Sequence, residues 1–210
     1  NVYRIVPIDG QGQYELTVRP NGTAPLQYSF FLYDSLAGED GKFASLDKPI
    51  AGLRNSDIQA NADGSFTITI DNAAAQGRRN HIQSNADARA LLIRNTLSDW
   101  NKQSPFAVSV KRVGGPAPEA APSEAQLASR AVELLKAGTQ TVLTLAENGV
   151  AGADQLAAKN TIAPPFARGG GWGFAAQGLF QLAQDEALVV TLDPLGARYL
   201  GFDLTTPWLV

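Results

Sequence analysis

The sequence contains no cysteine, no methionine and a single histidine among its 210 residues. Without cysteine the chain cannot form disulfides, thiolate nucleophiles, iron–sulfur clusters or cysteine-ligated zinc. One histidine cannot build a metal site of the usual kind, so we expect no metal and no other cofactor. No run of about 18 apolar residues occurs, so we expect no transmembrane segment and a soluble protein. The compartment stays open between cytoplasm and periplasm or secretion.

Charge is low overall but unevenly spread. The formal net charge is −3, so no basic field attracts nucleic acid or an anionic membrane surface. Residues 76–112 nevertheless hold seven basic residues against two acidic ones, a net charge of +5, which leaves −8 for the rest of the chain. This basic stretch contains His81, the only histidine.

The first 113 residues consist of short strand-like segments separated by turns. Apolar and polar residues alternate in several of them, which is the period of a strand with one buried face. About seven such segments at this spacing predict an antiparallel β-sandwich or jelly roll. The predicted strands are Val2–Ile8, Tyr14–Arg19, Leu26–Asp34, Ile58–Ala60, Phe66–Ile70, Ala90–Arg94 and Phe106–Arg112.

Two turn sequences predict how these strands pair. Asn21-Gly22 is typical of a tight hairpin, because both residues tolerate positive φ, so we expect the strands before and after it to pair. Asp63-Gly64 predicts a second hairpin, between Ile58–Ala60 and Phe66–Ile70. Phe66, Ile68 and Ile70 alternate with threonines and should face a core. The strand at Leu26–Asp34 is apolar on both faces near its end, which predicts burial between two layers.

Residues 114–160 change character to a linker followed by helical segments. Gly114–Pro122 is rich in proline and glycine and has little to pack. Ser123 and Gln126 have capping-box spacing, and an apolar stripe follows at helical spacing, formed by Leu127, Ala131, Leu134 and Leu135. We expect Gly138 to end or bend this helix, with shorter helical turns at Val142–Glu147 and Ala153–Lys159.

Strand patterns return in residues 161–210, which we interpret as a partial second β unit. The expected strands are Leu179–Leu182, Ala187–Leu192 and Ala197–Leu204. Their order of strand, Pro-x-Gly turn and aromatic strand matches residues 15–32, which indicates either an internal repeat or two unrelated hairpins. A repeat would stop before its sandwich is complete, so we expect a fragment of a longer protein. Another chain segment or subunit would then complete the second unit.

Four groups of short motifs in the two β parts support a family resemblance. They are 61–67 (NADGSFT), 77–81 (GRRNH), Leu92-Ile93-Arg94 before Asp99-Trp100, and 185–190 (DEALVV) with 196–199 (GARY). Together they resemble the bacterial family called domain of unknown function 1214, over residues 1–113 and about 160–210. The resemblance implies a β-sandwich or jelly-roll architecture, no established activity and no catalytic residues to carry over. In that family the second part continues through further strands past Trp208, where this sequence stops.

The candidate ligand-binding residues are Arg79, Asn80, His81, Arg94 and Trp172. A cleft lined by the two arginines and His81 would bind a carboxylate, sulfate or phosphate through charge-assisted, bidentate hydrogen bonds. Trp172 offers an aromatic face for a sugar ring or a lipid-like ligand. The alternative is that these side chains lie on different strand faces, solvated or locally paired, with Asn80 hydrogen-bonded to backbone groups of a structured loop.

Three functions remain compatible with these residues. We favour a small-molecule binding module, with an anion as the preferred ligand, within a larger protein or assembly. The alternative is a hydrolase or isomerase in which His81 acts as the base and a carboxylate such as Asp71 or Asp99 orients it. In the third, the chain is a structural part of an assembly.

Overall fold

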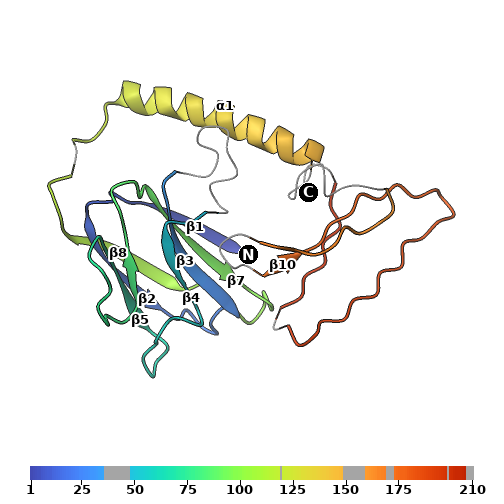
Figure 1. The fold of residues 1–210 in the computed structure, drawn as a ribbon, viewed down its shortest axis with the longest axis horizontal. Helices are drawn as coiled ribbons and strands as arrows, with labels where there is room; N and C mark the ends of the chain where they lie inside the picture. The colour runs from blue at the N-terminus through green and yellow to red at the C-terminus, as the bar shows by residue number, and fades with distance from the viewer. Residues whose placement is uncertain (36–47, 119, 149–158, 169–172, 198, 207–210) are drawn as a thin grey trace. The chain divides into compact units, whose positions relative to one another are not determined.

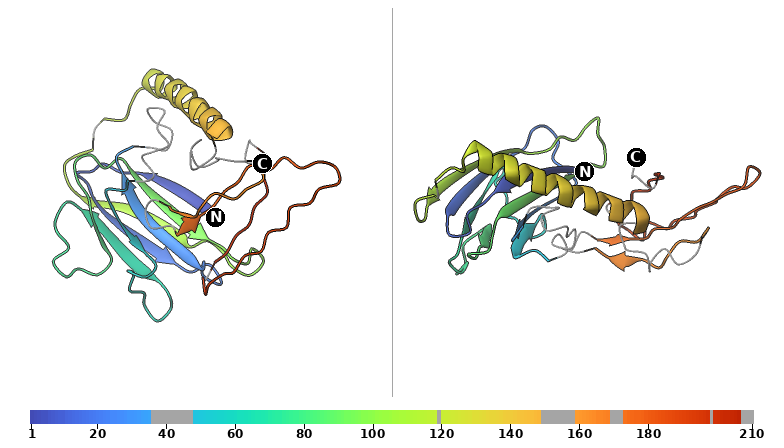
Figure 2. Two further views of the ribbon diagram at one scale, coloured as in Figure 1. Left: turned by 45° about the vertical axis from the view of Figure 1, so that its right-hand side comes forward. Right: turned by 90° about the horizontal axis from the view of Figure 1, so that it is seen from above.

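The computed structural model describes residues 1–35, 48–118, 120–148, 159–168, 173–197 and 199–206. The fold is mainly β, as predicted (Figures 1 and 2). The chain divides into two units: the first consists of Asn1–Leu36 and Lys48–Ser123, and the second includes Glu124–Val210.

The first unit is a β-sandwich of two four-stranded sheets. One sheet has the order β1-β7-β3-β4 and is antiparallel throughout; the other has the order β6-β5-β2-β8 and contains one parallel pair, β5 with β6. The strands are β1 (Val2–Pro7), β2 (Gln13–Arg19), β3 (Gln27–Tyr33), β4 (Ala51–Arg54), β5 (Phe66–Asp71), β6 (His81–Gln83), β7 (Ala90–Thr96) and β8 (Ala107–Gly114).

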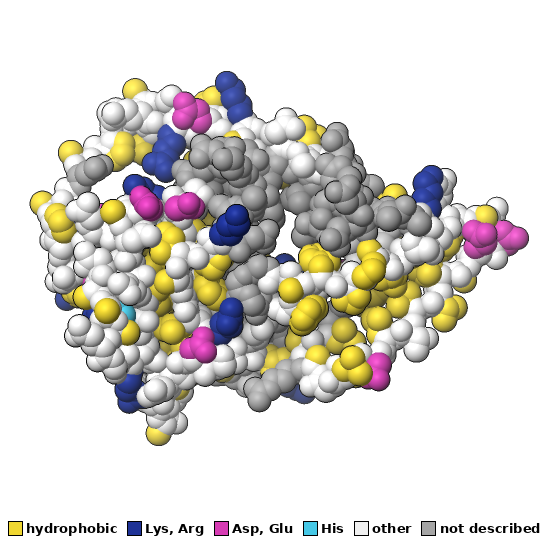
Figure 3. Space-filling model, in the orientation of Figure 1, with side chains coloured by type: hydrophobic (Ala, Val, Ile, Leu, Met, Phe, Trp, Pro, Cys, Tyr) yellow, Lys and Arg dark blue, Asp and Glu magenta, His cyan; other side chains and the backbone are white. Residues whose placement is uncertain are grey.

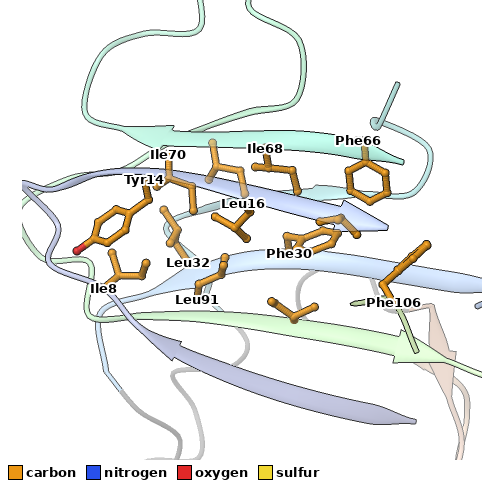
Figure 4. Close-up of a cluster of buried hydrophobic side chains, with 13 residues drawn as sticks. Ile8, Tyr14, Leu16, Phe30, Leu32, Phe66, Ile68, Ile70, Leu91 and Phe106 are labelled. Carbon is orange, nitrogen blue, oxygen red and sulfur yellow. The ribbon is translucent and has the colours of Figure 1, made fainter. Parts of the chain in front are cut away.

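The core lies between the two sheets (Figure 4). Phe66, Ile68 and Ile70 are buried on β5, which confirms the face predicted from their alternation. The Phe66 ring stands edge-on to two other buried rings, with centroids 5.9 Å from Phe30 and 5.6 Å from Phe106. Edge-to-face pairs of this kind add to the stability that burial alone provides.

The hairpin predicted at Asn21-Gly22 is wrong, because β2 and β3 lie in different sheets. β2 pairs with β5 and β8, whereas β3 pairs with β4 and β7. Gly22 has the expected positive φ of 85°, so the turn chemistry is present without the pairing. β3 is an inner strand of its own sheet and is buried on both faces.

The turn at Asp63-Gly64 is confirmed, but its predicted partner strand at Ile58–Ala60 does not form. The Asn61 amide donates to the Ser65 carbonyl oxygen at 2.8 Å, and Gly64 has a φ of 77°. The preceding strand is instead β4, which pairs with β3 in the opposite sheet. Ile58 packs against the core without joining a ladder.

The second unit begins with one long helix, α1 (Glu124–Asn148). The helix continues through Gly138, so it does not end there, and Val142–Glu147 belongs to the same helix. A helical glycine costs only about 1 kcal/mol relative to alanine, which strong helix formers on both sides can offset. Residues 153–158 of the third predicted helix lie outside the described residues. No helix among the described residues is long and apolar enough to cross a membrane.

The strands predicted in residues 179–204 form no sheet among the residues of this range that the structure describes. The second unit instead has a two-residue pairing of β9 (Phe166–Ala167) with β10 (Phe174–Ala175), on either side of the glycine-rich stretch. A single parallel bridge joins Lys159 to Leu179. Residues 184–197 and 199–206 contain turns and extended chain but no ladder.

Candidate functional site

The loop between β5 and β6, residues 72–80, is the best-defined candidate site. The two strands are parallel neighbours, with Thr69 opposite His81 and Asp71 opposite Gln83. The loop reverses at Gln76 and Gly77, which have φ values of 45° and 82°. This reversal returns the chain so that Arg78 and His81 lie beside the end of β5.

His81 is fully enclosed by hydrogen-bonding neighbours. Its side chain is 0% exposed. Nδ1 lies 3.0 Å from the Thr69 hydroxyl, and Nε2 lies 2.9 Å from the Ala73 carbonyl oxygen and 3.0 Å from Nη2 of Arg78. A carbonyl oxygen can only accept a hydrogen bond and a guanidinium can only donate one. Nε2 therefore donates to the Ala73 carbonyl oxygen when it carries a proton, and accepts from the Arg78 guanidinium when it does not.

Arg78 and Asp71 form a two-pronged ion pair beside this imidazole. Nη1 donates to Oδ2 at 2.6 Å and Nη2 to Oδ1 at 3.0 Å. Nη2 also donates to the carbonyl oxygens of Ala73 and Ala74, which ties the ion pair to the loop backbone. The hydrogen bonds from Arg78 hold the pKa of Asp71 below its usual value, and the same pair raises the pKa of Arg78.

This geometry fits a latch better than a catalytic base. A general base needs a nitrogen that a bound molecule can reach. Both ring nitrogens of His81 face groups of the chain itself, and the ring has no exposed surface. The four side chains of Thr69, Asp71, Arg78 and His81, which we call the β5–β6 latch, therefore fix the loop.

Asn80 and Arg79 lie at the outer end of the same loop. The Asn80 amide accepts from the Gln59 backbone N–H at 2.8 Å and donates to the Gln59 carbonyl oxygen at 2.9 Å, which is the backbone role expected for it. Arg79 is exposed, and its Nη2 reaches the same carbonyl oxygen at 3.4 Å. The guanidinium of Arg79 therefore remains accessible to solvent.

The structure does not bring Arg94 to this loop. Arg94 lies on β7, in the other sheet, and its neighbours Leu91 and Ile93 face the core. Successive side chains on a strand point to opposite faces, so Arg94 points away from the core on the far side of the sandwich. It is 4% exposed, donates to Oδ1 of Asn1 at 3.3 Å, and stands 5.9 Å from the centroid of the Tyr3 ring.

The predicted single cleft of Arg79, His81 and Arg94 therefore does not form. The two faces are separated by the thickness of a sandwich, and packed sheets lie about 10 Å apart even before side chains are added. The alternative, in which these side chains lie on different faces with local partners, describes what is observed. Trp172 lies outside the described residues.

The sequence analysis did not identify Thr69 as a site residue, and it considered Arg78 only as part of the basic stretch and of the GRRNH motif. The alternation that placed Ile68 and Ile70 in the core also implies that Thr69 points outward. Gly77 was the signal in the sequence for a turn before Arg78, and in the structure it has the positive φ of 82° that such a turn requires. Within the described residues, no group of three or more histidine, aspartate or glutamate side chains is arranged to hold a metal ion.

The comparisons with known proteins concern the fold alone. The sequence matches no protein-family model and no curated protein. The structure is similar to the crystal structure of an uncharacterized protein from Burkholderia cenocepacia, with a TM-score of 0.60 and 23% sequence identity. The similarity covers 79% of this chain and 42% of that chain, so the matched part is less than half of that protein.

Proposed function

We propose that the first unit is a binding module for a small anionic molecule, held at the outer end of the β5–β6 loop by Arg79. The observation that carries the proposal is the rigid support of this arginine. The latch fixes the residue before it, and Asn80 fixes the residue after it through two hydrogen bonds to Gln59. An exposed guanidinium on a fixed backbone loses little freedom when it binds a carboxylate, sulfate or phosphate.

The enzyme alternative has less support. A hydrolase or isomerase using His81 with Asp71 would need the imidazole to exchange a proton with a bound substrate. The enclosed ring weighs against that role, although Asp71 does lie near it, with Oδ1 3.7 Å from Nε2. Membership in the family called domain of unknown function 1214 is also a proposal, and the bacterial source of the similar structure is compatible with it.

Titration of the protein with sulfate, phosphate and citrate, followed by calorimetry, tests the binding proposal. We expect saturable binding of at least one anion, weakened roughly tenfold by Arg79→Ala, as for the loss of a charged hydrogen bond. Arg19→Ala removes the same charge from another exposed position and should leave the affinity unchanged. No saturable binding, or equal losses in the two variants, would overturn the proposal.

We also propose that the second unit works within an assembly, in which another chain segment or subunit covers its apolar residues. The many exposed large apolar side chains of this unit support the proposal, since exposed apolar residues that gather into a patch commonly mark an interaction surface. The internal repeat is part of the same proposal: a strand pair resembling residues 15–32 would be completed by added strands. Measurement of the solution mass over a range of concentrations tests it.

A further inference from the structure

Residues 187–194 and 199–204 are two extended arms, and a turn of the kind that closes β-hairpins lies between them at residues 194–197. The Ala197 amide donates to the Pro194 carbonyl oxygen at 2.7 Å, and the two central residues, Leu195 and Gly196, have φ values of 46° and 75°. Positive φ at both positions defines a type I′ turn, whose twist matches that of paired strands. A bulky leucine rarely adopts this conformation, so the turn is held in a form suited to strand pairing.

The described residues of the two arms nevertheless form no ladder with each other or with the rest of the second unit, and most of their large apolar side chains are exposed. Val189 is 85% exposed, Leu195 88% and Leu204 78%. Hydrophobic side chains gather over this part of the chain in Figure 3, which has the orientation of Figure 1. Exposed apolar surface along unpaired extended backbone is typical of a segment that joins a sheet of a partner.

The second arm has the pattern of a strand with one buried face. Leu200, Phe202 and Leu204 alternate with Gly201 and Asp203. A strand with these residues would place three large apolar side chains on one face and a carboxylate on the other. Such a strand fits beside an edge strand whose inner face is apolar and whose outer face carries a basic residue.

β8 is an edge strand with these properties. It stands at the end of its sheet among the described strands, with β2 on one side only. Val108 and Val110 pack against the core, whereas Ser109 and Lys111 are exposed on the opposite face. The charges are complementary: β8 has two basic residues and no acidic one, whereas residues 183–206 have four acidic residues and one basic one.

We propose that residues 199–204 of one molecule add as an antiparallel strand to the β8 edge of a second copy. In one register Asp203 lies opposite Lys111, and Leu204 lies opposite Val110 on the core side. Phe202 then lies opposite Arg112, whose charged end is held by Asp9 at 2.8 Å. Reciprocal exchange of the arms closes a two-fold dimer and leaves no β8 edge uncovered. This inference rests on the proposal that the second unit works within an assembly, and it identifies the partner in that assembly as a second copy of the chain.

The absence of cysteine allows a clean crosslinking test. In the proposed register Ser109 lies opposite Thr205, within disulfide reach, since opposed side chains have Cβ atoms about 5 Å apart. A mixture of Ser109→Cys and Thr205→Cys proteins should form a mixed disulfide dimer under mild oxidation. Thr191→Cys, an equally exposed threonine on the other arm, is the matched control and should not crosslink with Ser109→Cys. Equal crosslinking of the two would overturn the register.

Charge reversal tests the same contact without cysteines. Sedimentation equilibrium should show a dimer whose Kd rises roughly fivefold in Lys111→Glu and falls back in the double variant Lys111→Glu, Asp203→Lys. Lys102→Glu makes the same charge change at another exposed lysine and should leave the Kd unchanged. A monomer at every concentration, or a dimer indifferent to both reversals, would overturn the inference. Anion titration of Lys111→Glu separates the two proposals, because Arg79 binding does not need the dimer.

Discussion

The Thr69 hydroxyl lies 3.0 Å from Nδ1 of His81, directly opposite on the neighbouring parallel strand. With the other ring nitrogen beside the Ala73 carbonyl oxygen and Arg78, the imidazole joins β5, β6 and the loop between them. The only histidine of the chain therefore has a structural role. Its removal should destabilise the loop between β5 and β6 directly, and should affect ligand binding only through that loop.

Replacing His81 by alanine should destabilise the first unit by about 2 to 4 kcal/mol, because it leaves a cavity and unpaired groups around it. Urea unfolding measures the loss. Trypsin provides a local readout, since Arg78 and Arg79 are both in the loop: we expect faster cleavage there in His81→Ala than in the natural protein. Unchanged stability and cleavage would contradict the latch.

The stability of the first unit should fall at acid pH through Asp71. Its pKa is below the usual 3.8 in the folded protein, chiefly because Arg78 donates two hydrogen bonds to it. The ionised form is thus favoured by folding, and its contribution is complete above about pH 4 and is lost as pH falls through the folded pKa. Asp71→Asn should flatten the acid limb of a plot of unfolding free energy against pH.

Arg78→Ala should flatten the same limb, because it removes the cause of the lowered pKa. If the two side chains act as a pair, the acid limb of the double variant should be no flatter than that of either single variant. Additive effects would show that Asp71 titrates independently of Arg78. The measurement is a set of urea unfolding curves between neutral and acid pH.

Gly10→Ala should be strongly destabilising, by about 3 kcal/mol, because the added methyl group would meet the Asn85 carbonyl oxygen and the Ala86 backbone. Backbone atoms cannot move aside as a flexible side chain can. Gly138→Ala is the contrasting case: nothing lies within 4 Å of the added methyl group, and α1 should gain about 1 kcal/mol of helix stability. Circular dichroism during thermal unfolding distinguishes the two.

Phe66→Ala should cost about 3 to 5 kcal/mol, because Phe66 contacts the buried ring of Phe30 in the opposite sheet and that of Phe106 just before β8. Phe174→Ala provides the comparison, since Phe174 is 76% exposed and its loss should change the stability by less than about 0.5 kcal/mol. Comparable losses in the two variants would contradict the assignment of the core.

The features of this fold that could be predicted from the sequence are those that depend on the spacing of apolar residues along a strand. Alternation placed Ile68 and Ile70 inside, and apolar character on both faces correctly identified β3 as a doubly buried strand. Asn21-Gly22 misled because turn chemistry is local, whereas the sheet that a strand joins depends on distant partners. β4 and β6 were missed because four and three residues are too few to show a period.

For the candidate site too, local roles could be predicted from the sequence, whereas roles that depend on distant partners could not. Asn80 could be assigned a backbone role, because asparagine beside a turn commonly has one. The face of Arg94 was hidden by the unbroken apolar run that precedes it, in which Leu91, Leu92 and Ile93 show no alternation. The sequence did not indicate that Arg78 would be held in an ion pair while Arg79 would remain accessible to solvent, because that depends on how the loop folds.

The pairing of β1 with β7 and of β2 with β8 also governs how the protein can be made. β1 must wait for a partner roughly ninety residues later, and β2, although it can pair earlier with β5, waits about as long for β8. The Asn1 side chain accepts a hydrogen bond from the Thr96 hydroxyl at 2.8 Å. During synthesis on the ribosome, the sheet β1-β7-β3-β4 cannot be completed until β7 has emerged, and the other sheet cannot be completed until β8 has emerged, so apolar strands stay uncovered for much of that time. Such long-range topology folds slowly, and chaperones would have time to bind the nascent chain.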